Sequence, residues 1–303
     1  MRILLTSTHV TSFIKDDLAF LRSHFPVDHL ITSGPGAPVA ILTHMRGISH
    51  TFTWFASVYA GLVVLSARLL GKRTILVVGG ADLARFPEIG YGLWNSRWKA
   101  GVAKYALRHA DRVLAVDGFL KEQARTLARY DGSNIEVIPT GFDAAFWTPS
   151  GPRELRVLTV AVCVNEARVK VKGIDILFEA ARRLKDTPFS IVGMSPDMIA
   201  RYRNEAPENV EMIPPVEQST LREYYRRSSV YCQPSMMEGL PNSVCEAMLC
   251  GCIPVGTRVG GMQTAIEEQG VLVPYGDPEK LADVLSEVLH RPAAGLSERA
   301  RNH

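Results

Sequence analysis

Residues 233–251 read QPSMMEGLPNSVCEAMLCG, and this stretch decides the architecture that the rest of the chain must fit. It begins at the end of the apolar run Val230–Gln233, which predicts a buried strand, and continues into the helical run Ser243–Cys250. Gly239 permits a tight turn between the two, and Pro241 suits a first helical turn, where an N–H would lack a partner anyway. The stretch therefore predicts a strand, a tight turn and a helix whose N-terminus lies beside the strand end.

Two carboxylates, Glu238 and Glu246, flank this turn eight positions apart. The N–H groups of the first helical turn and the positive end of the helix dipole form a site suited to a diphosphate. A carboxylate repels a phosphate, so both side chains are expected to accept hydrogen bonds from uncharged groups. Hydroxyl groups of a sugar on one side and of a ribose on the other meet that requirement.

Strands and helices alternate on both sides of this stretch. In the first half, strands are predicted at Ile3–Leu5, Val39–Leu42, Thr74–Val78, Arg112–Val116 and Ile135–Ile138, with helices at Asp17–His24, Thr53–Leu70, Arg97–Arg108 and Leu120–Ala128. In the second half, strands are predicted at Val157–Val162, Phe189–Val192, Val210–Ile213, Val230–Gln233, Ile253–Val255 and Val271–Val273, with helices at Gly173–Leu184, Ser219–Arg227, Ser243–Cys250 and Pro278–His290. Apolar strands alternating with helices imply parallel sheets covered on both faces.

A Pro/Gly-rich stretch without periodicity, Pro139–Pro152, separates the two halves. It predicts an N-terminal domain of residues 1–148 and a C-terminal domain of residues 149–303, both α/β. In open parallel sheets, ligands bind beyond the carboxyl ends of the strands. Chemistry is therefore expected in a cleft between the two domains.

The composition indicates an ordinary globular protein. The chain has 303 residues, of which 47% are hydrophobic and 21% charged, and this is enough to bury a core in each of two domains. A formal net charge of +3 is too small to indicate nucleic-acid binding. The opening MRILLT is too short for a signal peptide, and none of the five cysteines has a spacing typical of zinc sites. These features predict a cytoplasmic protein with buried thiols and no metal site.

Two features of the first half bear on membrane contact. Residues 97–129 hold eight Lys or Arg against three acids, and Thr51–Ala67 is a stretch of 17 residues without a charge. A spanning helix needs about 20 apolar residues, so the uncharged stretch predicts a buried helix packed on a sheet. The basic run favours either solvated helix faces or peripheral contact with anionic lipid at the inner face of the cell membrane.

At Glu238 and Glu246 the sequence resembles the GT-B glycosyltransferases of family GT4 (glycosyl transferases group 1), whose signature is two glutamates separated by seven residues. The resemblance implies that Glu238 holds hydroxyl groups of the donor hexose and that Glu246 binds the ribose. It implies that the backbone of Gly239 and Leu240 meets the diphosphate, within a donor-binding turn that includes Pro241 and Asn242. The surrounding EGLPNS and the following AMLCGCIPVGT make the match specific.

Other segments resemble the same family in the same order. Residues 168–173, RVKVKG, are similar to its Lys-Gly phosphate clamp, which implies that Lys172 neutralises the leaving diphosphate. The family's arginine, directly after the preceding strand, is missing here. Arg168 or Lys170 is expected to reach in instead, with Arg168 preferred and a solvated loop charge as the alternative reading of Lys170. Pro215 and Val216 match a segment whose backbone brackets the base.

The first half matches the family more loosely. Residues 77–82, VVGGAD, lie where many relatives have His-Gly-x-Asp, and Gly79 replaces the histidine. Asp82 is the candidate contact on the acceptor side, with a structural cap as the alternative. His9 is a lone histidine, more often structural than catalytic. Relatives end with a long helix that crosses back to the first domain, and this crossover helix is expected to be truncated here.

The resemblance implies a GT-B fold, that is, two Rossmann-like parallel-sheet domains facing an interdomain cleft. It implies a retaining glycosyltransferase that moves a hexose from a UDP-, GDP- or ADP-linked donor to a glycan or lipid-linked acceptor hydroxyl. The implied catalytic residues are Lys172, Glu238 and Arg168, acting without a cofactor or metal ion. The alternatives are a GT-B sugar-nucleotide epimerase or phosphorylase, and a non-catalytic partner subunit that binds a sugar nucleotide.

Overall fold

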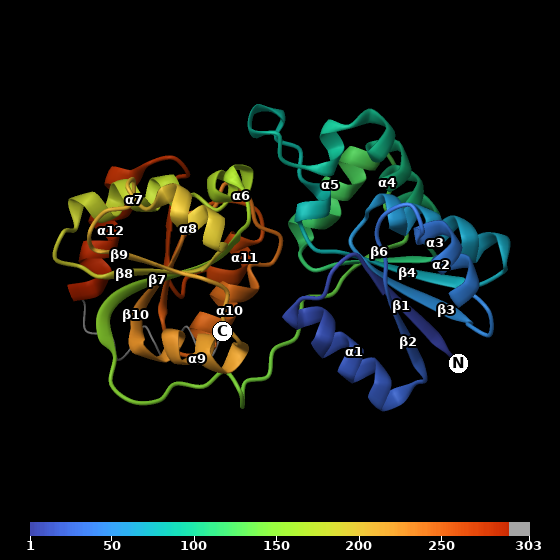
Figure 1. The fold of residues 1–303 in the computed structure, drawn as a ribbon, viewed down its shortest axis with the longest axis horizontal. Coiled ribbons are helices and arrows are strands. Elements are labelled where there is room, and N and C mark those ends of the chain that lie inside the picture. The colour runs from blue at the N-terminus through green and yellow to red at the C-terminus, as the bar shows by residue number, and fades with distance from the viewer. Residues whose placement is uncertain (291–303) are drawn as a thin grey trace. The chain divides into compact units, whose positions relative to one another are not determined.

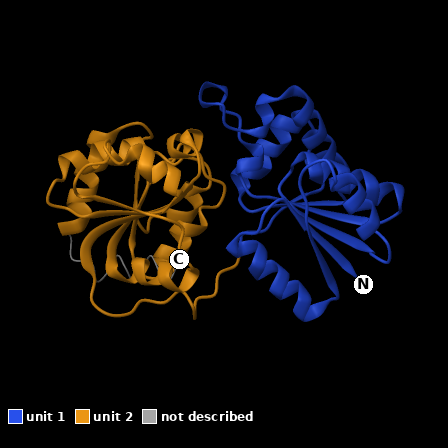
Figure 2. Cartoon of the chain, in the orientation of Figure 1, with its two compact units in different colours: residues 1–140 blue, residues 141–303 orange. Residues whose placement is uncertain are grey.

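The computed structural model describes residues 1–290, and the chain divides into two compact units (Figure 2). Unit 1 comprises Met1–Thr140, and unit 2 begins at Gly141. This division falls inside the Pro/Gly-rich segment 139–152, and the predicted boundary after residue 148 lies in the same segment. The predicted truncation of a crossover helix concerns residues beyond 290 and lies outside the described residues.

Unit 1 is built on a parallel sheet of six strands in the order β2-β1-β3-β4-β5-β6. The strands are β1 Ile3–Ser7, β2 Val27–Ile31, β3 His50–Trp54, β4 Arg73–Val78, β5 Arg112–Ala115 and β6 Ile135–Val137. The helices are α1 Ser12–His24, α2 Ala37–His44, α3 Val58–Leu69, α4 Arg97–His109 and α5 Gly118–Ala128. Figure 1 shows α1 on one face of this sheet and α2 to α5 on the other. Strand β1, in the interior of the sheet, is buried at all of its positions.

The strand predicted at Val39–Leu42 is wrong, because these residues lie in α2. Their branched apolar side chains are typical of a strand, yet a proline near the helix start favours helix entry. Burial at every fourth position follows the helical period and places one face of α2 in the core: Ala37, Ile41 and Met45.

The helix predicted at Thr53–Leu70 is partly wrong, because its first residues end β3 and the helix begins at Val58. The Ser57 hydroxyl caps α3 by accepting a hydrogen bond from the Ala60 N–H (3.2 Å). Strands β2 and β3 were not predicted. Strand β2 carries the polar pair Asp28-His29 and lies at the sheet edge, so it lacks an apolar run. The rest of the uncharged stretch forms most of α3, whose inner face is buried as predicted.

Within residues 1–290, no helix has both the length and the apolar character needed to cross a membrane. The longest helices of unit 1, α1 and α4, have 13 residues each, whereas a span needs about 20. Peripheral contact with a membrane surface does not require such a helix.

Unit 2 is also built on a six-stranded parallel sheet, in the order β12-β11-β10-β7-β8-β9. The strands are β7 Glu154–Cys163, β8 Phe189–Met194, β9 Val210–Ile213, β10 Ser228–Gln233, β11 Ile253–Thr257 and β12 Val271–Val273. The helices are α6 Glu166–Val171, α7 Ile174–Arg183, α8 Pro196–Tyr202, α9 Gln218–Arg227, α10 Asn242–Leu249, α11 Met262–Ile266 and α12 Pro278–His290. The six strands and four helices predicted for this half are confirmed, and the short α6, α8 and α11 were not predicted.

Strand β7 lies between β8 and β10. The chain passes from β7 to β8 on one side and from β10 to β11 on the other, so the connections after β7 and β10 run in opposite directions. The carboxyl ends of β7 and β10 therefore form a topological switch point, where ligands bind in open α/β sheets. Gly173 joins the two ends tightly. Its φ is +65°, and a Cβ there would lie 1.9 Å from the Pro234 carbonyl oxygen. The Met236 N–H also donates to the Val171 carbonyl (2.8 Å), so the segments after β7 and β10 are held together.

Candidate functional site

The candidate site lies in unit 2 at the carboxyl edge of the sheet, around the β7–β10 switch point. Three segments build it: residues 164–173 after β7, residues 234–241 after β10 and residues 258–261 after β11. The Gly261 N–H donates to the Glu238 carbonyl oxygen (3.2 Å) and ties the third segment to the second. The chain thus brings residues that are distant in sequence to one edge of one unit.

Lys172 and Glu238 form an ion pair at this edge, with 2.6 Å between Nζ and Oε1. Their side chains are only 15% and 11% exposed. Oε1 also accepts hydrogen bonds from Ser235 Oγ (2.6 Å) and Gln233 Nε2 (2.9 Å). Three donors therefore hold one carboxylate oxygen. The other, Oε2, accepts no hydrogen bond from the described residues, which leaves it for hydroxyl donors of a ligand.

A buried relay of polar side chains lies behind Glu238. The Tyr231 hydroxyl donates to Gln233 Oε1 (2.5 Å), and Gln233 Nε2 donates in turn to Ser235 Oγ (2.8 Å). All three side chains are fully buried. Burial raises the pKa of Tyr231 well above its usual value, so this phenol stays a hydrogen-bond donor. The sequence analysis missed this relay, and its only signal was polar residues at the end of an otherwise apolar strand.

Glu246 lies on α10 and is 8% exposed. Its Oε2 accepts a hydrogen bond from the hydroxyl of Tyr225, which lies on α9 (2.9 Å). Burial and the Glu246 charge raise the pKa of Tyr225 well above its usual value, so the phenol holds the carboxylate as a donor. Tyr225 was also missed, because helix α9 reads as an ordinary amphipathic helix in the sequence.

Helix α10 begins at Asn242, with Pro241 in the capping position and Gly239 and Leu240 directly before it. The first helical hydrogen bond of this end runs from the Val244 N–H to the Pro241 carbonyl (2.9 Å). N–H groups earlier in the turn have no intrahelical acceptor and are the natural donors to an anion. This turn lies in the chain between Glu238 and Glu246, and a diphosphate site here stays a prediction.

The other residues predicted on the donor side are Arg168, Pro215 and Val216. Arg168 lies on α6, where its Nε donates to the Val162 carbonyl (3.2 Å). Burial raises the pKa of the Cys163 thiol to about 11, and the charges of Lys172 and Arg168 oppose that rise, so both cations lie near this strand end. Pro215 and Val216 follow β9. Pro215 is exposed, and Val216 packs against the same hydrophobic core as Leu240.

Asp82, the residue predicted on the acceptor side, lies in unit 1 in the short helical turn Ala81–Leu83 that follows β4. Its carboxylate is buried and accepts hydrogen bonds from the N–H groups of Ala56 (2.8 Å), Gly80 (2.8 Å) and Gly79 (3.2 Å). Burial raises the pKa of Asp82, and these backbone bonds act in the opposite direction. The side chain therefore fixes loops at the ends of β3 and β4.

Within residues 1–290, no group of three or more His, Cys, Asp or Glu side chains is placed to hold a metal ion. The five cysteines carry free thiols, and four of them are buried. Burial raises the pKa of Cys252 to about 11 and that of Cys245 to about 12, which makes both unreactive.

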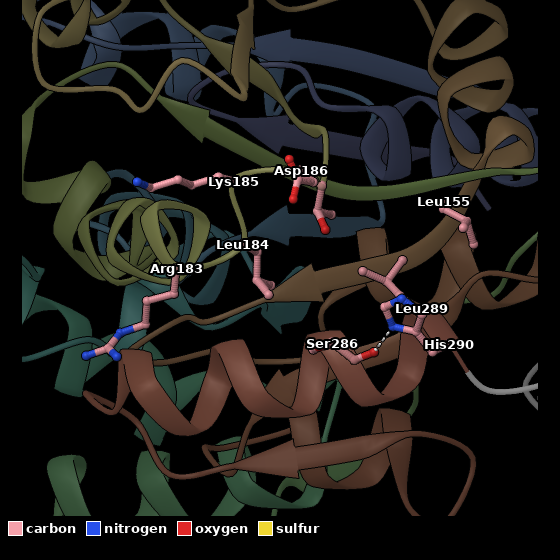
Figure 3. Close-up of a pocket in the computed structure, with 9 residues that line it drawn as sticks. Leu155, Arg183, Leu184, Lys185, Asp186, Ser286, Leu289 and His290 are labelled. Atoms are coloured by element: carbon pink, nitrogen blue, oxygen red, sulfur yellow. Dashed lines mark hydrogen bonds between the residues drawn. The ribbon is translucent and has the colours of Figure 1, made fainter.

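A cavity of about 320 Å³ occurs elsewhere in unit 2 (Figure 3). Leu155 at the start of β7, Lys185 before β8 and His290 at the end of α12 lie on its wall. These positions are at the amino edge of the sheet, opposite Lys172 and Glu238. Because ligands of such sheets bind at the carboxyl edge, this cavity is not the donor site.

The chain thus consists of two Rossmann-like α/β units, which is the architecture of GT-B glycosyltransferases. Two family models match the chain: one described as Glycosyl transferases group 1 matches residues 158–291, and one described as Glycosyltransferase Family 4 matches residues 23–146. The chain belongs to the GT4 family of GT-B glycosyltransferases.

Curated relatives carry related names. A D-inositol 3-phosphate glycosyltransferase from Mycolicibacterium smegmatis is 29% identical over 212 residues, which cover 64% of this chain and 49% of that protein. The gpi3 subunit of a phosphatidylinositol N-acetylglucosaminyltransferase from Schizosaccharomyces pombe is 24% identical over 234 residues, which cover 75% of this chain and 50% of that protein. The chain thus spans about half the length of the curated relatives it matches.

Solved structures share the fold over the whole chain. A sucrose-phosphate synthase from Thermosynechococcus elongatus has a TM-score of 0.82 at 17% identity, covering 99% of this chain and 93% of that one. HepE from Anabaena, solved with UDP and glucose, has a TM-score of 0.79 at 16% identity, covering 100% of this chain and 94% of that one. Both likenesses establish the GT-B fold.

Proposed function

We propose that this protein is a retaining glycosyltransferase that moves a hexose from a nucleotide-sugar donor to a glycan or lipid-linked acceptor hydroxyl. One observation carries the proposal. The Lys172–Glu238 pair, the α10 N-terminus and Glu246 lie together at the switch point of unit 2. The cation and the free helix amides suit a diphosphate, and the two carboxylates suit hydroxyl groups of a hexose and of a ribose.

The proposed chemistry breaks the bond between the anomeric carbon and the diphosphate oxygen and forms a bond from the acceptor hydroxyl oxygen to the same face of that carbon. The hydroxyl proton leaves on the departing diphosphate. Negative charge grows on the departing diphosphate, where Lys172, Arg168 and the Gly239-Leu240 amides act on it. Glu238 Oε2 accepts hydrogen bonds from hexose hydroxyls while the relay holds its other oxygen. We propose no protein nucleophile, an oxocarbenium-like transition state and no metal ion or cofactor.

The comparisons support the donor class more than the acceptor. HepE, solved with UDP and glucose and also with UDP-glucose, favours a UDP-linked donor, with GDP and ADP as alternatives. The relatives named for inositol phosphate and phosphatidylinositol support a polyol or lipid-linked acceptor. The rival functions are an epimerase and a non-catalytic subunit that binds a sugar nucleotide.

A thermal-shift panel of UDP-, GDP- and ADP-sugars tests the donor. A ligand that binds only the native state adds about 2.7 kcal/mol of stability at 100 times its Kd. We expect one nucleotide series to raise Tm with concentration and the others to do so weakly. The absence of a shift with every nucleotide sugar would contradict the proposal. Donor binding without release of the nucleoside diphosphate, whichever acceptor is added, would instead favour the non-catalytic subunit.

We also propose peripheral contact between unit 1 and an anionic membrane surface. Helix α4 begins with Arg97-Trp98-Lys99, and Trp98 is 62% exposed with Lys99 Nζ 5.8 Å from its ring centroid. Further along α4, burial and the charges of Arg108 and Arg129 lower the pKa of Lys104, which indicates a crowded positive patch. An exposed indole between cations suits the lipid headgroup region.

Vesicle co-sedimentation tests this contact. Each basic residue near an anionic surface contributes about 1 kcal/mol and is screened beyond a Debye length, so binding should be weak and salt-sensitive. We expect binding to phosphatidylglycerol vesicles at low salt, its loss at high salt and none on neutral vesicles. Trp98→Ala should weaken it, whereas Phe20→Ala on exposed α1 should not. Wild-type protein that stays in the supernatant at low salt would rule this surface out.

A further inference from the structure

Unit 1 has a topological switch point of its own. Strand β1 lies between β2 and β3. The chain passes from β1 to β2 on one side and from β3 to β4 on the other, so the connections after β1 and β3 run in opposite directions. Beyond the carboxyl ends of β1 and β3 lie residues 8–10 and Phe55-Ala56. Ligands of open α/β sheets bind outside such a point.

A cluster of aromatic rings occupies this edge of unit 1. The exposed His9 ring stacks on the Phe55 ring, with 5.5 Å between centroids and 11° between planes. Behind them, Phe13 from α1 packs on Trp54 at 4.7 Å and meets Phe55 edge-on at 6.1 Å. The four rings thus form one aromatic cluster at this edge, in which Trp54 is buried, Phe13 and Phe55 are partly buried and His9 is exposed.

The backbone of Phe55 is held in a conformation that side chains rarely adopt, with a φ of +68°. Its N–H donates to the Val77 carbonyl (2.8 Å), and its own carbonyl accepts from the Ser57 N–H (2.8 Å). A non-glycine residue in this region is strained and persists only where its surroundings enforce it. Such strain at a ligand-binding edge indicates that the position of the ring matters.

Asp82 and Gly79 enforce the position of this ring. The buried Asp82 carboxylate binds the N–H of Ala56, the residue after Phe55, and those of Gly79 and Gly80 on the neighbouring strand end. At Gly79 a Cβ would lie 2.8 Å from Cε1 of Phe55, so a larger residue there would displace the ring. Gly79 therefore leaves the space that the Phe55 ring occupies.

We propose that the His9–Phe55 pair is a stacking platform for the ring of the acceptor, and that this acceptor is a cyclic polyol such as a hexopyranose or inositol. The inference rests on the proposed transferase function and names its acceptor class. Aromatic faces pack against the C–H faces of such rings, while polar groups at the rim meet their hydroxyls. The Thr8 hydroxyl, 3.0 Å from Nδ1 of His9, is such a group. Asp82 is then a positioning residue that does not touch the ligand.

Ligand-observed saturation-transfer NMR on the full chain tests the platform. The probes are methyl α-D-glucopyranoside, methyl α-D-mannopyranoside and myo-inositol, each measured with UDP present. We expect transfer to the ring C–H protons of at least one probe, with affinity roughly tenfold lower in His9→Ala and in Phe55→Gly. Glycine adopts a positive φ without strain, so Phe55→Gly removes the ring and keeps the backbone. His9→Phe and Phe55→Tyr keep stacking rings and should retain binding.

The chain offers a matched control in Tyr105 and His109, a second stacked pair on α4 with 4.3 Å between centroids. His109→Ala removes the same kind of contact away from the switch point and should leave sugar binding unchanged. Equal binding by wild type, His9→Ala and Phe55→Gly would overturn the platform, and so would no transfer to any probe from wild type that binds UDP. Failure of wild type to bind UDP would count against the donor site instead.

Discussion

Replacing Lys172 by alanine is expected to lower the turnover of the nucleotide sugar by about 10²–10³-fold, with a much smaller loss of donor affinity. The reason is that charge on the diphosphate grows as the glycosidic bond breaks, so a cation beside it acts mainly on the transition state. Glu238 should keep its place, because Gln233 and Ser235 still hold its Oε1. A donor titration that follows nucleotide release measures kcat and KM separately.

Two further variants make the Lys172 result specific. Lys172→Arg keeps the charge and should recover part of the rate. Lys170→Ala removes an exposed cation two residues earlier on α6 and should leave the rate unchanged. A wild-type rate in Lys172→Ala would show that Lys172 does not act in the site. An equal loss of rate in Lys170→Ala would show that Lys172 acts only through the total positive charge of this segment.

The fold of unit 2 was predictable because its strands are continuous apolar runs separated by clear helices and turns. Unit 1 was harder at two places for physical reasons. In α2 the run from Val39 to Leu42 has the composition of a strand, and only the fourfold spacing of its buried side chains reveals the helix. Strand β2 is a sheet edge with partly buried polar residues, so it lacks the apolar signal of an interior strand.

The residues of the candidate site also differ in how far the sequence predicts them. Lys172, Glu238 and Glu246 stand in short linear motifs, so they could be proposed from the sequence, and the structure brings Lys172 against Glu238 across 66 positions. The buried partners Tyr225 and Gln233 were missed, because their hydrogen bonds depend on the packing of elements that sequence patterns do not pair. Asp82 was expected on the acceptor side or as a structural cap, and its three backbone donors were not predictable because they come from loops that follow two different strands.

Replacing Glu246 by alanine is expected to weaken nucleotide binding by about 10–150-fold. This is the loss of a hydrogen bond to a charged group, worth about 1.5–3 kcal/mol. The effect should appear equally with UDP and with the UDP-sugar, because the predicted partners of Glu246 are ribose hydroxyls rather than hexose hydroxyls. Glu246→Gln keeps an acceptor for the Tyr225 hydroxyl and should fold like wild type. Glu208→Ala, an exposed acid at the amino edge of the same sheet, is the matched control.

Isothermal titration calorimetry of UDP into the wild-type protein and these variants tests the central claim, that unit 2 holds a nucleoside diphosphate between Lys172 and Glu246. The account predicts saturable binding to wild type and to Glu208→Ala, and affinity at least about tenfold lower in Glu246→Ala with Tm confirming a folded protein. Wild-type affinity for UDP in Glu246→Ala, or no binding of UDP, GDP or ADP by the wild-type chain, would contradict it.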